Sequence, residues 1–274
     1  MRKVELDQYF TRHEDAKRCI AALNDLYPLT DYDIILEPSA GAGAFFQLLP
    51  PNREGLDILP LCDGVKEGDF FEYQPPPGGK IAVIGNPPFG RRGSLAKRFF
   101  QKSAEFADVI AFIMPAIFGK ATFHRSLNLS FHLEWEEPIH LFELPNGQQH
   151  KVNCLFQIWK KKDIHRIHKT LPRSHQDFEM IHRHISRTTP EEIERLIKDY
   201  HFAFGQVSHK LADLQNIQRG SQFIIKDVSS HGKVREIFQS MNFDHLKRYS
   251  MGAVSLSRSD IIEAYSKVLA NVKK

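Results

Sequence analysis

The tetrapeptide Asn86-Pro87-Pro88-Phe89 carries the side chains best suited to chemistry in this sequence. It directly follows an apolar run, residues 81–85, which predicts a buried strand. Two prolines fix φ and remove two N–H groups, so the turn is stiff and its carbonyls stay outside a strand ladder. Such carbonyls and the Asn86 side-chain oxygen can accept hydrogen bonds from an amine, while Phe89 offers a flat apolar face. The pattern predicts a pocket for an exocyclic amine, and a rigid connection capped by Asn86 is the alternative.

A second group of ligand-type residues follows the predicted strand 33–36. Glu37 lies at its mouth, and Gly41 and Gly43 allow a sharp turn and a close approach of the backbone to a ligand. The spacing differs from the Gly-x-Gly-x-x-Gly of dinucleotide folds, and a carboxylate here repels a pyrophosphate. The same carboxylate suits the ammonium group of an amino-acid-like ligand. The alternative is that Glu37 only caps a helix.

Further acids and aromatic residues follow the later strands. Asp57 lies at the end of the predicted strand 55–58, where a carboxylate can bind both hydroxyls of a ribose. Asp69 and Phe70, just after Gly68, suit the amine and the ring of an adenine. As alternatives, Asp57 could cap a helix and Phe70 could belong to the core.

The residues Gln8, Tyr9, Phe10 and Thr11 precede the first predicted helix. Thr11-x-x-Glu14 has the form of a capping box, in which the threonine side chain closes the helix start. A helix N-terminus can hold the carboxylate of a ligand. The alternative is a hydrophobic staple made by Tyr9 and Phe10 beside the cap.

Strands and helices alternate through the first half of the chain, which predicts a parallel, doubly wound α/β sheet. Ser94 is predicted to cap a helix that carries Leu95, Phe99 and Phe106 on one side. The predicted strands are residues 33–36, 55–58, 82–84, 109–113 and 152–159.

The pattern changes near residue 162, which divides a first domain, 1–162, from a second, 163–274. In the second domain Thr189 begins a helix with proline at the first helical position, and Ser257 caps a C-terminal helix. A β-like patch lies between them at 223–225. We therefore expect a small α+β region after the larger α/β domain.

Composition places this chain of 274 residues among folded proteins, with 42% hydrophobic and 26% charged residues. No apolar stretch is long enough to span a bilayer, and residues 1–7 lack the core of a signal peptide. The three cysteines are scattered, and the fourteen histidines show no ligand spacing, so neither a disulfide framework nor a metal site is predicted. These features predict a cytoplasmic protein, or a nuclear one in a eukaryote; they define no oligomeric state.

A basic stretch begins at Lys160, Lys161 and Lys162. Between residues 160 and 187 eight Lys/Arg residues face three acids, so this stretch carries the positive charge of the chain. Such a concentration fits a polyanionic partner, and a solvated linker is the alternative.

The chain resembles the S-adenosylmethionine-dependent amino-methyltransferases in the order of its motifs. It carries Gln-Tyr-Phe-Thr, Glu-Pro-Ser-Ala-Gly-x-Gly-x-Phe, an acid after the second strand, Gly-Asp-Phe-Phe and Asn-Pro-Pro-Phe. It is most similar to the N6-adenine methyltransferases whose cofactor motifs precede the Asn-Pro-Pro-aromatic motif. The resemblance covers residues 6 to about 160. For the remainder, the family would place a small target-recognition region.

The resemblance implies a Rossmann-like, seven-stranded class I methyltransferase sheet with one antiparallel strand, helices on both faces, and bound S-adenosylmethionine. It implies N6-methylation of adenine in nucleic acid, with DNA slightly favoured over RNA. The implied cofactor residues are Gln8, Tyr9, Phe10 and Thr11 at the methionine end, Glu37, Gly41 and Gly43 at the centre, Asp57 at the ribose, and Asp69 and Phe70 at the adenine.

The tetrapeptide supplies the implied catalytic residues. Asn86 and the Pro87 carbonyl would accept hydrogen bonds from the target amine, Pro88 completes the stiff turn, and Phe89 would stack on the base. In duplex substrate the nucleotide would have to flip out of the stack. The basic residues that follow could hold phosphates or only cover a helix surface, namely Arg91, Arg92, Lys97 and Arg98.

Three alternative functions stay open. Protein-glutamine methyltransferases use a similar Asn-Pro-Pro-Tyr pocket but usually carry an Asp-x-Gly-x-Gly motif, unlike the Glu-Pro-Ser-Ala-Gly found here. Cytosine-N4 methyltransferases more often have serine in place of Asn86. A non-catalytic subunit that kept the fold could bind nucleic acid, although its cofactor motifs would be expected to degenerate.

Overall fold

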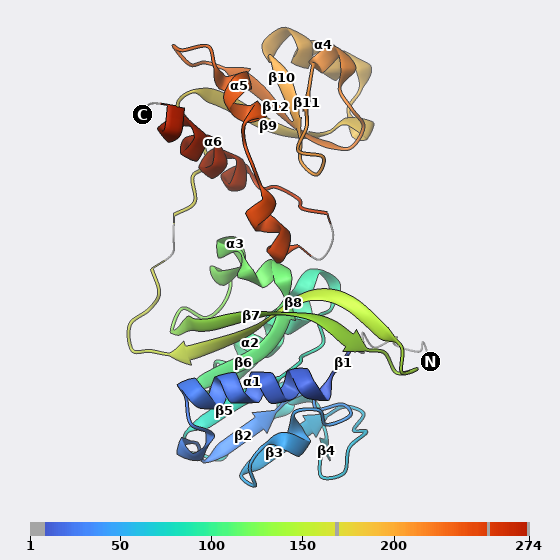
Figure 1. Ribbon diagram of the computed structural model, residues 1–274, viewed down its shortest axis with the longest axis vertical. Coiled ribbons are helices and arrows are strands. Elements are labelled where there is room, and N and C mark those ends of the chain that lie inside the picture. The colour runs from blue at the N-terminus through green and yellow to red at the C-terminus, as the bar shows by residue number, and fades with distance from the viewer. Residues whose placement is uncertain (1–8, 168–169, 251–252, 273–274) are drawn as a thin grey trace. The chain divides into compact units, whose positions relative to one another are not determined.

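The computed structural model describes residues 9–167, 170–250 and 253–272 (Figure 1). The chain forms two compact units, Met1–His168 and Lys169–Lys274, and each is described by itself. The division lies a few residues beyond the boundary expected at residue 162. In the described part of the chain, no helix has both the length and the apolar character needed to cross a membrane.

The first unit is built on one eight-stranded sheet, in the order β1-β7-β8-β6-β5-β2-β3-β4. Neighbours from β4 to β6 are parallel, whereas β8 is antiparallel to both β6 and β7, and β1 is antiparallel to β7. The parallel arrangement expected from the alternation is confirmed for β4 to β6. The complete sheet is mixed, because β8 and β1 both run antiparallel to these strands, whereas one antiparallel strand was expected. The strands are β1 (Phe10–Thr11), β2 (Ile34–Glu37), β3 (Arg53–Asp57), β4 (Lys66–Glu67), β5 (Ile81–Gly85), β6 (Val109–Pro115), β7 (Phe131–Glu143) and β8 (Gln149–Lys161).

The strand count differs from the seven expected because Phe10 and Thr11 form the edge strand β1. Thr11 pairs with Phe142 and does not cap a helix. Helix α1 (His13–Leu26) begins after Arg12, which makes no side-chain cap hydrogen bond. The predicted capping box is therefore wrong, since pairing with a distant strand takes the backbone of Thr11.

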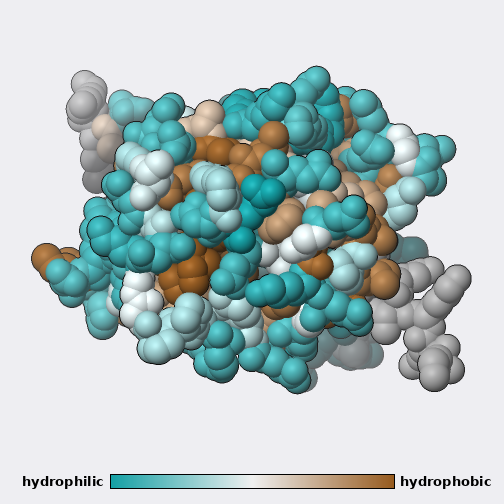
Figure 2. Space-filling view, turned by 90° about the horizontal axis from the view of Figure 1, so that it is seen from below, coloured by the Kyte–Doolittle hydropathy of each residue, from teal (hydrophilic) through white to brown (hydrophobic). Residues whose placement is uncertain are grey.

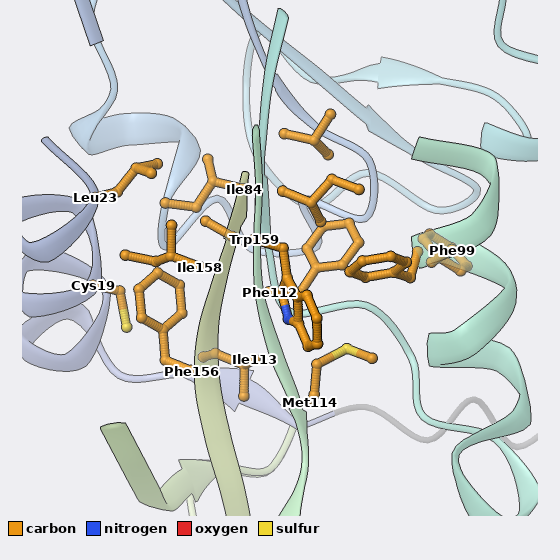
Figure 3. Packing of buried hydrophobic residues seen from close by; sticks show 14 of the residues in the cluster. Cys19, Leu23, Ile84, Phe99, Phe112, Ile113, Met114, Phe156, Ile158 and Trp159 are labelled. Carbon is orange, nitrogen blue, oxygen red and sulfur yellow. The ribbon is translucent and has the colours of Figure 1, made fainter. Parts of the chain in front are cut away.

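Helices cover both faces of the sheet. Cys19 and Leu23 of α1 pack on one face, and Phe99 of α2 (Ser94–Ser103) packs on the opposite face (Figure 3). Every residue of β5 and of β6 is buried, as expected for strands covered on both sides. Large side chains such as Trp159 are fully buried, and each contributes about 1.5–3 kcal/mol to stability by leaving water.

The sequence did not reveal β7, although it is one of the two longest strands. Its apolar alternation is interrupted by Pro138 and by register shifts between Leu133 and Trp135 and between Ile139 and Leu141. A bulge moves the following side chains to the other face, so the period of two is lost. Helix α2 also starts differently from the prediction, because Gly93 holds the N-cap position and Ser94 is the first helical residue. A short helix α3 (Ala121–His124) connects β6 to β7.

The second unit is a four-stranded antiparallel sheet with helices on both faces. Its strands lie in the order β11-β10-β12-β9. Thr189 and Glu192 form the capping box predicted for the first helix, and Ser257 accepts a hydrogen bond from the Asp260 N–H (3.2 Å). The elements are β9 (Phe178–His184), α4 (Pro190–Asp199), β10 (Phe202–Gly205), β11 (Leu211–Ala212), β12 (Ser221–Asp227), α5 (Val234–Gln239) and α6 (Arg258–Val272).

Arg166 ties the last residues of the first unit to its core. Its Nη2 donates to the carbonyls of His124 (3.0 Å) and Asn128 (3.1 Å), and its Nε donates to the carbonyl of Phe131. The guanidinium also lies over the Trp159 ring, at 5.1 Å from the centroid. Burial lowers the pKa of this guanidinium. A planar fork of donors is needed to reach several carbonyls at once.

Replacing Arg166 by alanine should lower the free energy of unfolding by about 2–3 kcal/mol, because several buried carbonyls lose a charged donor. Arg166→Lys keeps the charge without the fork, and we expect an intermediate loss. Urea denaturation measures both values. Arg125, an exposed neighbour, gives the matched control, and its alanine variant should stay within about 0.5 kcal/mol of the unsubstituted protein. An equal loss in both alanine variants would contradict the role of Arg166.

Candidate active site at the carboxyl ends of the strands

A cavity of about 510 Å³ opens where β2, β3 and β5 end. Because these strands are parallel, their carboxyl ends meet at one edge of the sheet, where ligands bind in open α/β folds. The cavity brings together most of the predicted site residues. These are Tyr9, Phe10, Thr11, Glu37, Gly41, Asp57, Asp69, Phe70, Asn86, Pro87, Pro88 and Phe89.

Two predicted cofactor residues are not in this lining. Gln8 lies outside the described residues. Gly43 has φ +80°, and a Cβ there would come within 2.4 Å of the Cys62 sulfur. Its glycine is therefore explained by the turn and by the packing of Cys62. Gly41 does line the cavity, with φ +49° and the Phe10 ring 3.4 Å from the position of a Cβ.

The amide of Asn86 is held by the backbone of Tyr9. Its Nδ2 donates to the Tyr9 carbonyl at 2.8 Å, and this carbonyl can only accept. The orientation of the amide is thereby fixed, and Oδ1 is left buried without a hydrogen-bond partner. The Ser39 hydroxyl donates to the Asn86 main-chain carbonyl (3.3 Å). Asn86 thus presents an acceptor that the described residues leave unpaired.

The aromatic residue of the tetrapeptide is covered. Phe89 is only 5% exposed, and its ring stacks on Tyr9 with 6.1 Å between the centroids and 26° between the planes. The Phe89 carbonyl accepts from the N–H groups of Leu95 (3.0 Å) and Ala96 (3.3 Å), which fixes the start of α2. Stacking of Phe89 on a base stays a prediction.

Glu37 is a buried acid with an unused oxygen. Its side chain is 2% exposed, and Oε2 has no hydrogen-bond partner. Burial raises the pKa of Glu37 well above its usual range, and the nearby Asp57 adds to the rise. An unpaired buried carboxyl is costly, so a cationic donor from a ligand would stabilise it.

Asp57 organises the glycine-containing loop. Its Oδ2 accepts from the Gly41 N–H (2.7 Å), and its Oδ1 accepts from the Leu59 N–H (2.8 Å). Each carboxylate oxygen can accept a second hydrogen bond, so two hydroxyl groups of a ligand can still be bound. Asp57 can therefore both hold the loop and bind ligand hydroxyls, because its hydrogen bonds to the backbone fix the orientation of the carboxylate.

Asp69 and Phe70 differ in exposure. Asp69 is exposed and accepts from the Phe71 N–H (2.9 Å) at the start of a short 3-10 turn. Phe70 is buried and stacks on Phe99 (5.1 Å between centroids), so it also belongs to the core. Arg98 lies over the Phe71 ring at 4.3 Å and lines the cavity. Arg98 is one of the basic residues that follow the tetrapeptide in the sequence, and the structure places it in the lining of the cavity.

Unpaired polar atoms concentrate at this cavity. Among the described residues, four buried side-chain polar atoms lack a partner, and those of Thr11, Glu37 and Asn86 belong to residues of the lining. Buried polar groups are normally hydrogen-bonded, so three exceptions in one cavity indicate a ligand site. The predicted site at the start of α1 does not exist in that form, since Thr11 lies in β1. The residues fit an amino-acid-like cofactor such as S-adenosylmethionine because they leave one acid and two neutral polar groups unpaired.

The rim of the cavity is apolar on one side. Ile58, Leu59 and Leu61 follow β3, line the cavity and are each more than half exposed. Figure 2 views the molecule from the side of β3 and β4 in Figure 1, and apolar patches interrupt a largely hydrophilic surface there. The sequence placed no function on these residues. Exposed apolar side chains at a cavity mouth can cover a bound ligand.

The predicted basic residues occupy two places. Arg91 and Arg92 are exposed in the turn after Phe89, and Lys97 is half-buried in α2. Lys160 pairs in register with Val109, so residues 160–162 lie at the amino ends of the parallel strands, away from the cavity.

The three lysines also differ in their surroundings. The Lys160 ammonium lies over the rings of Tyr27 (5.3 Å) and Tyr32 (5.7 Å). Lys162 pairs with Glu134 at 2.7 Å, and Lys161 is exposed. In the ranges that the structure describes, no group of three or more His, Cys, Asp or Glu residues is placed to bind a metal.

Comparison with known proteins gives fold similarities alone. No family model and no curated protein sequence matches the chain. A protein from Pyrococcus horikoshii proposed to be an RNA methyltransferase is similar with a TM-score of 0.47 and 19% identity, over 59% of this chain and 90% of that one. A proposed class I S-adenosylmethionine-dependent methyltransferase from Listeria monocytogenes gives 0.44 and 14%, over 60% and 64%. The 23S rRNA methyltransferase ErmE gives 0.41 and 14%, over 58% and 71%.

Proposed function

We propose that this protein is an S-adenosylmethionine-dependent methyltransferase that methylates N6 of adenine in nucleic acid. The observation that carries the proposal is the unpaired Oδ1 of Asn86, in a stiff Asn-Pro-Pro-Phe turn that lines the cavity. The Pro87 carbonyl accepts no hydrogen bond from the described residues either. An exocyclic amine has two hydrogens, and these two acceptors suit it.

The cofactor would be held by the residues that line the remainder of the cavity. Glu37 would bind its ammonium group, Asp57 its ribose hydroxyls, and Asp69 and Phe70 its adenine. The Gly41 backbone would lie close to it, and Thr11 would offer its unpaired hydroxyl. Bound S-adenosylmethionine supplies a methyl group on a sulfonium that is already a good leaving group.

The residues of the tetrapeptide would act on the target nitrogen. Its lone pair is delocalised into the ring, which makes it a poor nucleophile. Hydrogen bonds from the amine to Asn86 Oδ1 and the Pro87 carbonyl would favour a tetrahedral nitrogen and free the lone pair for in-line attack on the methyl carbon. The N–C bond would form as the C–S bond breaks, and the methylated nitrogen would then lose one proton to solvent. Orientation and fixed dipoles would supply most of the rate acceleration.

The basic residues would contact the phosphates of the substrate. Arg91, Arg92 and Lys97 would hold those next to the target nucleotide, and Lys160–Lys162 would hold phosphates farther away. Residues 163–274 would add target recognition. We expect the double substitution of Arg91 and Arg92 by glutamine to weaken binding and to flatten its salt dependence by about one unit of slope per lost phosphate contact. Titrations at several salt concentrations measure this.

Neutralising Lys160, Lys161 and Lys162 should flatten the salt dependence in the same way. Its effect on turnover at saturating substrate should be small, because these residues lie away from the cavity. For the double glutamine variant of Arg91 and Arg92, the matched control is the double variant Arg91→Lys and Arg92→Lys, which keeps both charges. Unchanged binding by the glutamine variants at every salt concentration would show that these residues contact no phosphate.

Labelled cofactor tests the proposed function directly. The protein is incubated with separate pools of DNA, RNA and protein, and the labelled pool is digested for mass analysis. N6-methyladenine in a nucleic-acid pool is the expected result, and the pool identifies the polymer. Methylated glutamine or N4-methylcytosine would overturn the assignment of adenine as the target. If none of the three pools became labelled, the assignment of methyltransferase activity would be overturned.

A further inference from the structure

Tyr9, whose carbonyl accepts a hydrogen bond from the Asn86 amide, stacks on two other aromatic rings. The Tyr9 ring stacks on Phe89, with 6.1 Å between centroids and 26° between planes. It also stacks on His150, with 5.5 Å and 18°. His150 comes from β8 and is otherwise exposed. Tyr9 thus joins the β7–β8 hairpin to the aromatic residue of the tetrapeptide.

The backbone of Tyr9 is fixed by hydrogen bonds, whereas its ring makes aromatic contacts. Besides the two stacked rings, the Phe142 ring of β7 meets it edge-on, with 6.2 Å between centroids and 62° between planes. The Tyr9 carbonyl accepts the hydrogen bond from Asn86 Nδ2 (2.8 Å), and the next residue, Phe10, pairs with Glu143 in β1. Side-chain rotation about Cα–Cβ leaves both interactions intact. The ring of Tyr9 can therefore shift against Phe89 without a change in the orientation of the Asn86 amide.

Phe89 offers no free face to a substrate in this arrangement, since it is only 5% exposed. A planar base between two parallel rings needs about 7 Å, which is twice the carbon–carbon contact distance of about 3.5 Å. The centroids of Tyr9 and Phe89 are 6.1 Å apart, which is within the range of offset-stacked rings in contact, so the two rings cover each other. The Tyr9 ring must therefore move away from Phe89 by about 3.5 Å, the thickness of one stacked layer, to admit a base beside Asn86.

We infer that the target base inserts between Phe89 and Tyr9, so that Tyr9 is the second stacking surface of the substrate site. The inference rests on the proposed function and deepens it. Tyr9 then belongs with the base, whereas the resemblance assigned it to the cofactor. Asn86 selects an exocyclic amine, and the two rings select a planar group that is unpaired or flipped out of a duplex.

A binding cycle between the Tyr9 ring and the base tests the inference. The first probe is a short single-stranded DNA with one central deoxyadenosine among thymidines; the second is identical but abasic at that nucleotide. RNA versions are measured in parallel. Because both probes carry the same phosphates, the ratio of their affinities isolates the contribution of the base. Unsubstituted protein should bind the adenine probe more tightly.

Tyr9→Leu removes the ring but keeps an apolar side chain and the backbone bond to Asn86. We expect the affinity ratio to fall by about 5- to 150-fold, the range for stacking of one base. Tyr9→Phe keeps the ring and should stay within about twofold of the unsubstituted protein. Trp135→Leu, a change at an exposed ring of β7 outside the cavity lining, should leave the ratio unchanged. Thermal denaturation establishes that all variants fold.

The outcomes separate the inference from the proposed function. An unchanged or larger ratio in Tyr9→Leu would overturn the inference, since Tyr9 would then only block Phe89. Lost cofactor affinity with a normal ratio would also overturn it and return Tyr9 to the cofactor. Absence of N6-methyladenine in the labelling experiment would overturn the proposed function itself. Equal binding of both probes by a protein that does methylate adenine would overturn the inference alone.

Discussion

Replacement of Asn86 by alanine should lower the rate of methyl transfer by about 10²- to 10³-fold while the binding of S-adenosylmethionine survives. The variant loses the acceptor Oδ1, which no described residue satisfies, and the Nδ2 donor to Tyr9. Loss of one fixed polar group that stabilises a transition state costs about 10²- to 10³-fold in turnover. Single-turnover assays measure the rate, and calorimetry measures the cofactor affinity.

Two variants beside Asn86→Ala separate its two roles. Asn86→Asp keeps an acceptor for the amine but sets a carboxylate oxygen against the Tyr9 carbonyl, so we expect it to be impaired as well. Ser39→Ala removes only the hydroxyl that donates to the Asn86 main-chain carbonyl (3.3 Å), and its loss of turnover should stay below about tenfold. Normal turnover in Asn86→Ala would contradict the mechanism.

The affinity for S-adenosylmethionine should rise with pH and then level off, and Glu37→Gln should remove this dependence. Burial raises the pKa of Glu37, so the ligand-free protein keeps this carboxyl protonated above its usual range. A bound ammonium favours the carboxylate, so binding releases a proton and is weakened by low pH. Loss of the charged hydrogen bond at high pH costs about 1.5–3 kcal/mol, or about 10- to 150-fold in affinity. Calorimetry in buffers of different ionisation enthalpy counts the proton.

The stability of the ligand-free protein should fall with rising pH because of Glu37, whereas the cofactor affinity should rise. The folded state holds this proton more tightly than the unfolded state, since the folded pKa is the higher one. Stability therefore falls as pH rises from the ordinary carboxyl range to the raised pKa. Glu37→Gln should make stability less dependent on pH in this range and should raise the melting temperature at the upper end of the range. A cofactor affinity independent of pH in the unsubstituted protein would contradict the assignment of Glu37.

The positions of the chief site residues could be predicted from local sequence. The apolar run before Asn86 forms β5, and Glu37 and Asp57 end β2 and β3. Parallel strands bring their carboxyl ends to one edge, so residues distant in sequence meet in one cavity once the alternation is recognised. For this reason the tetrapeptide and both acids were found without any knowledge of side-chain contacts.

Features that depend on pairing between distant strands could not be predicted from the sequence. Phe10 and Thr11 form only two residues of strand, and their partner Phe142 lies far along the chain, so the local capping pattern was misleading. Pro138 and two bulges hid β7. The stacking of Tyr9 on Phe89 could not be predicted either. The residue after Tyr9 is positioned by the pairing of β1 with β7, and the sequence revealed neither strand. No local pattern encodes such a contact.

The irregular strand β7 also bears on association with other chains. Beyond its short pairing with β1, the outer edge of β7 has no strand neighbour among the described residues. A long flat edge would template the addition of a foreign strand and promote aggregation. This edge instead carries Pro138, three glutamates and two register shifts that twist it, and these features disfavour such pairing. The irregularities that hid β7 from sequence-based prediction thus help to keep the folded protein from forming intermolecular sheets.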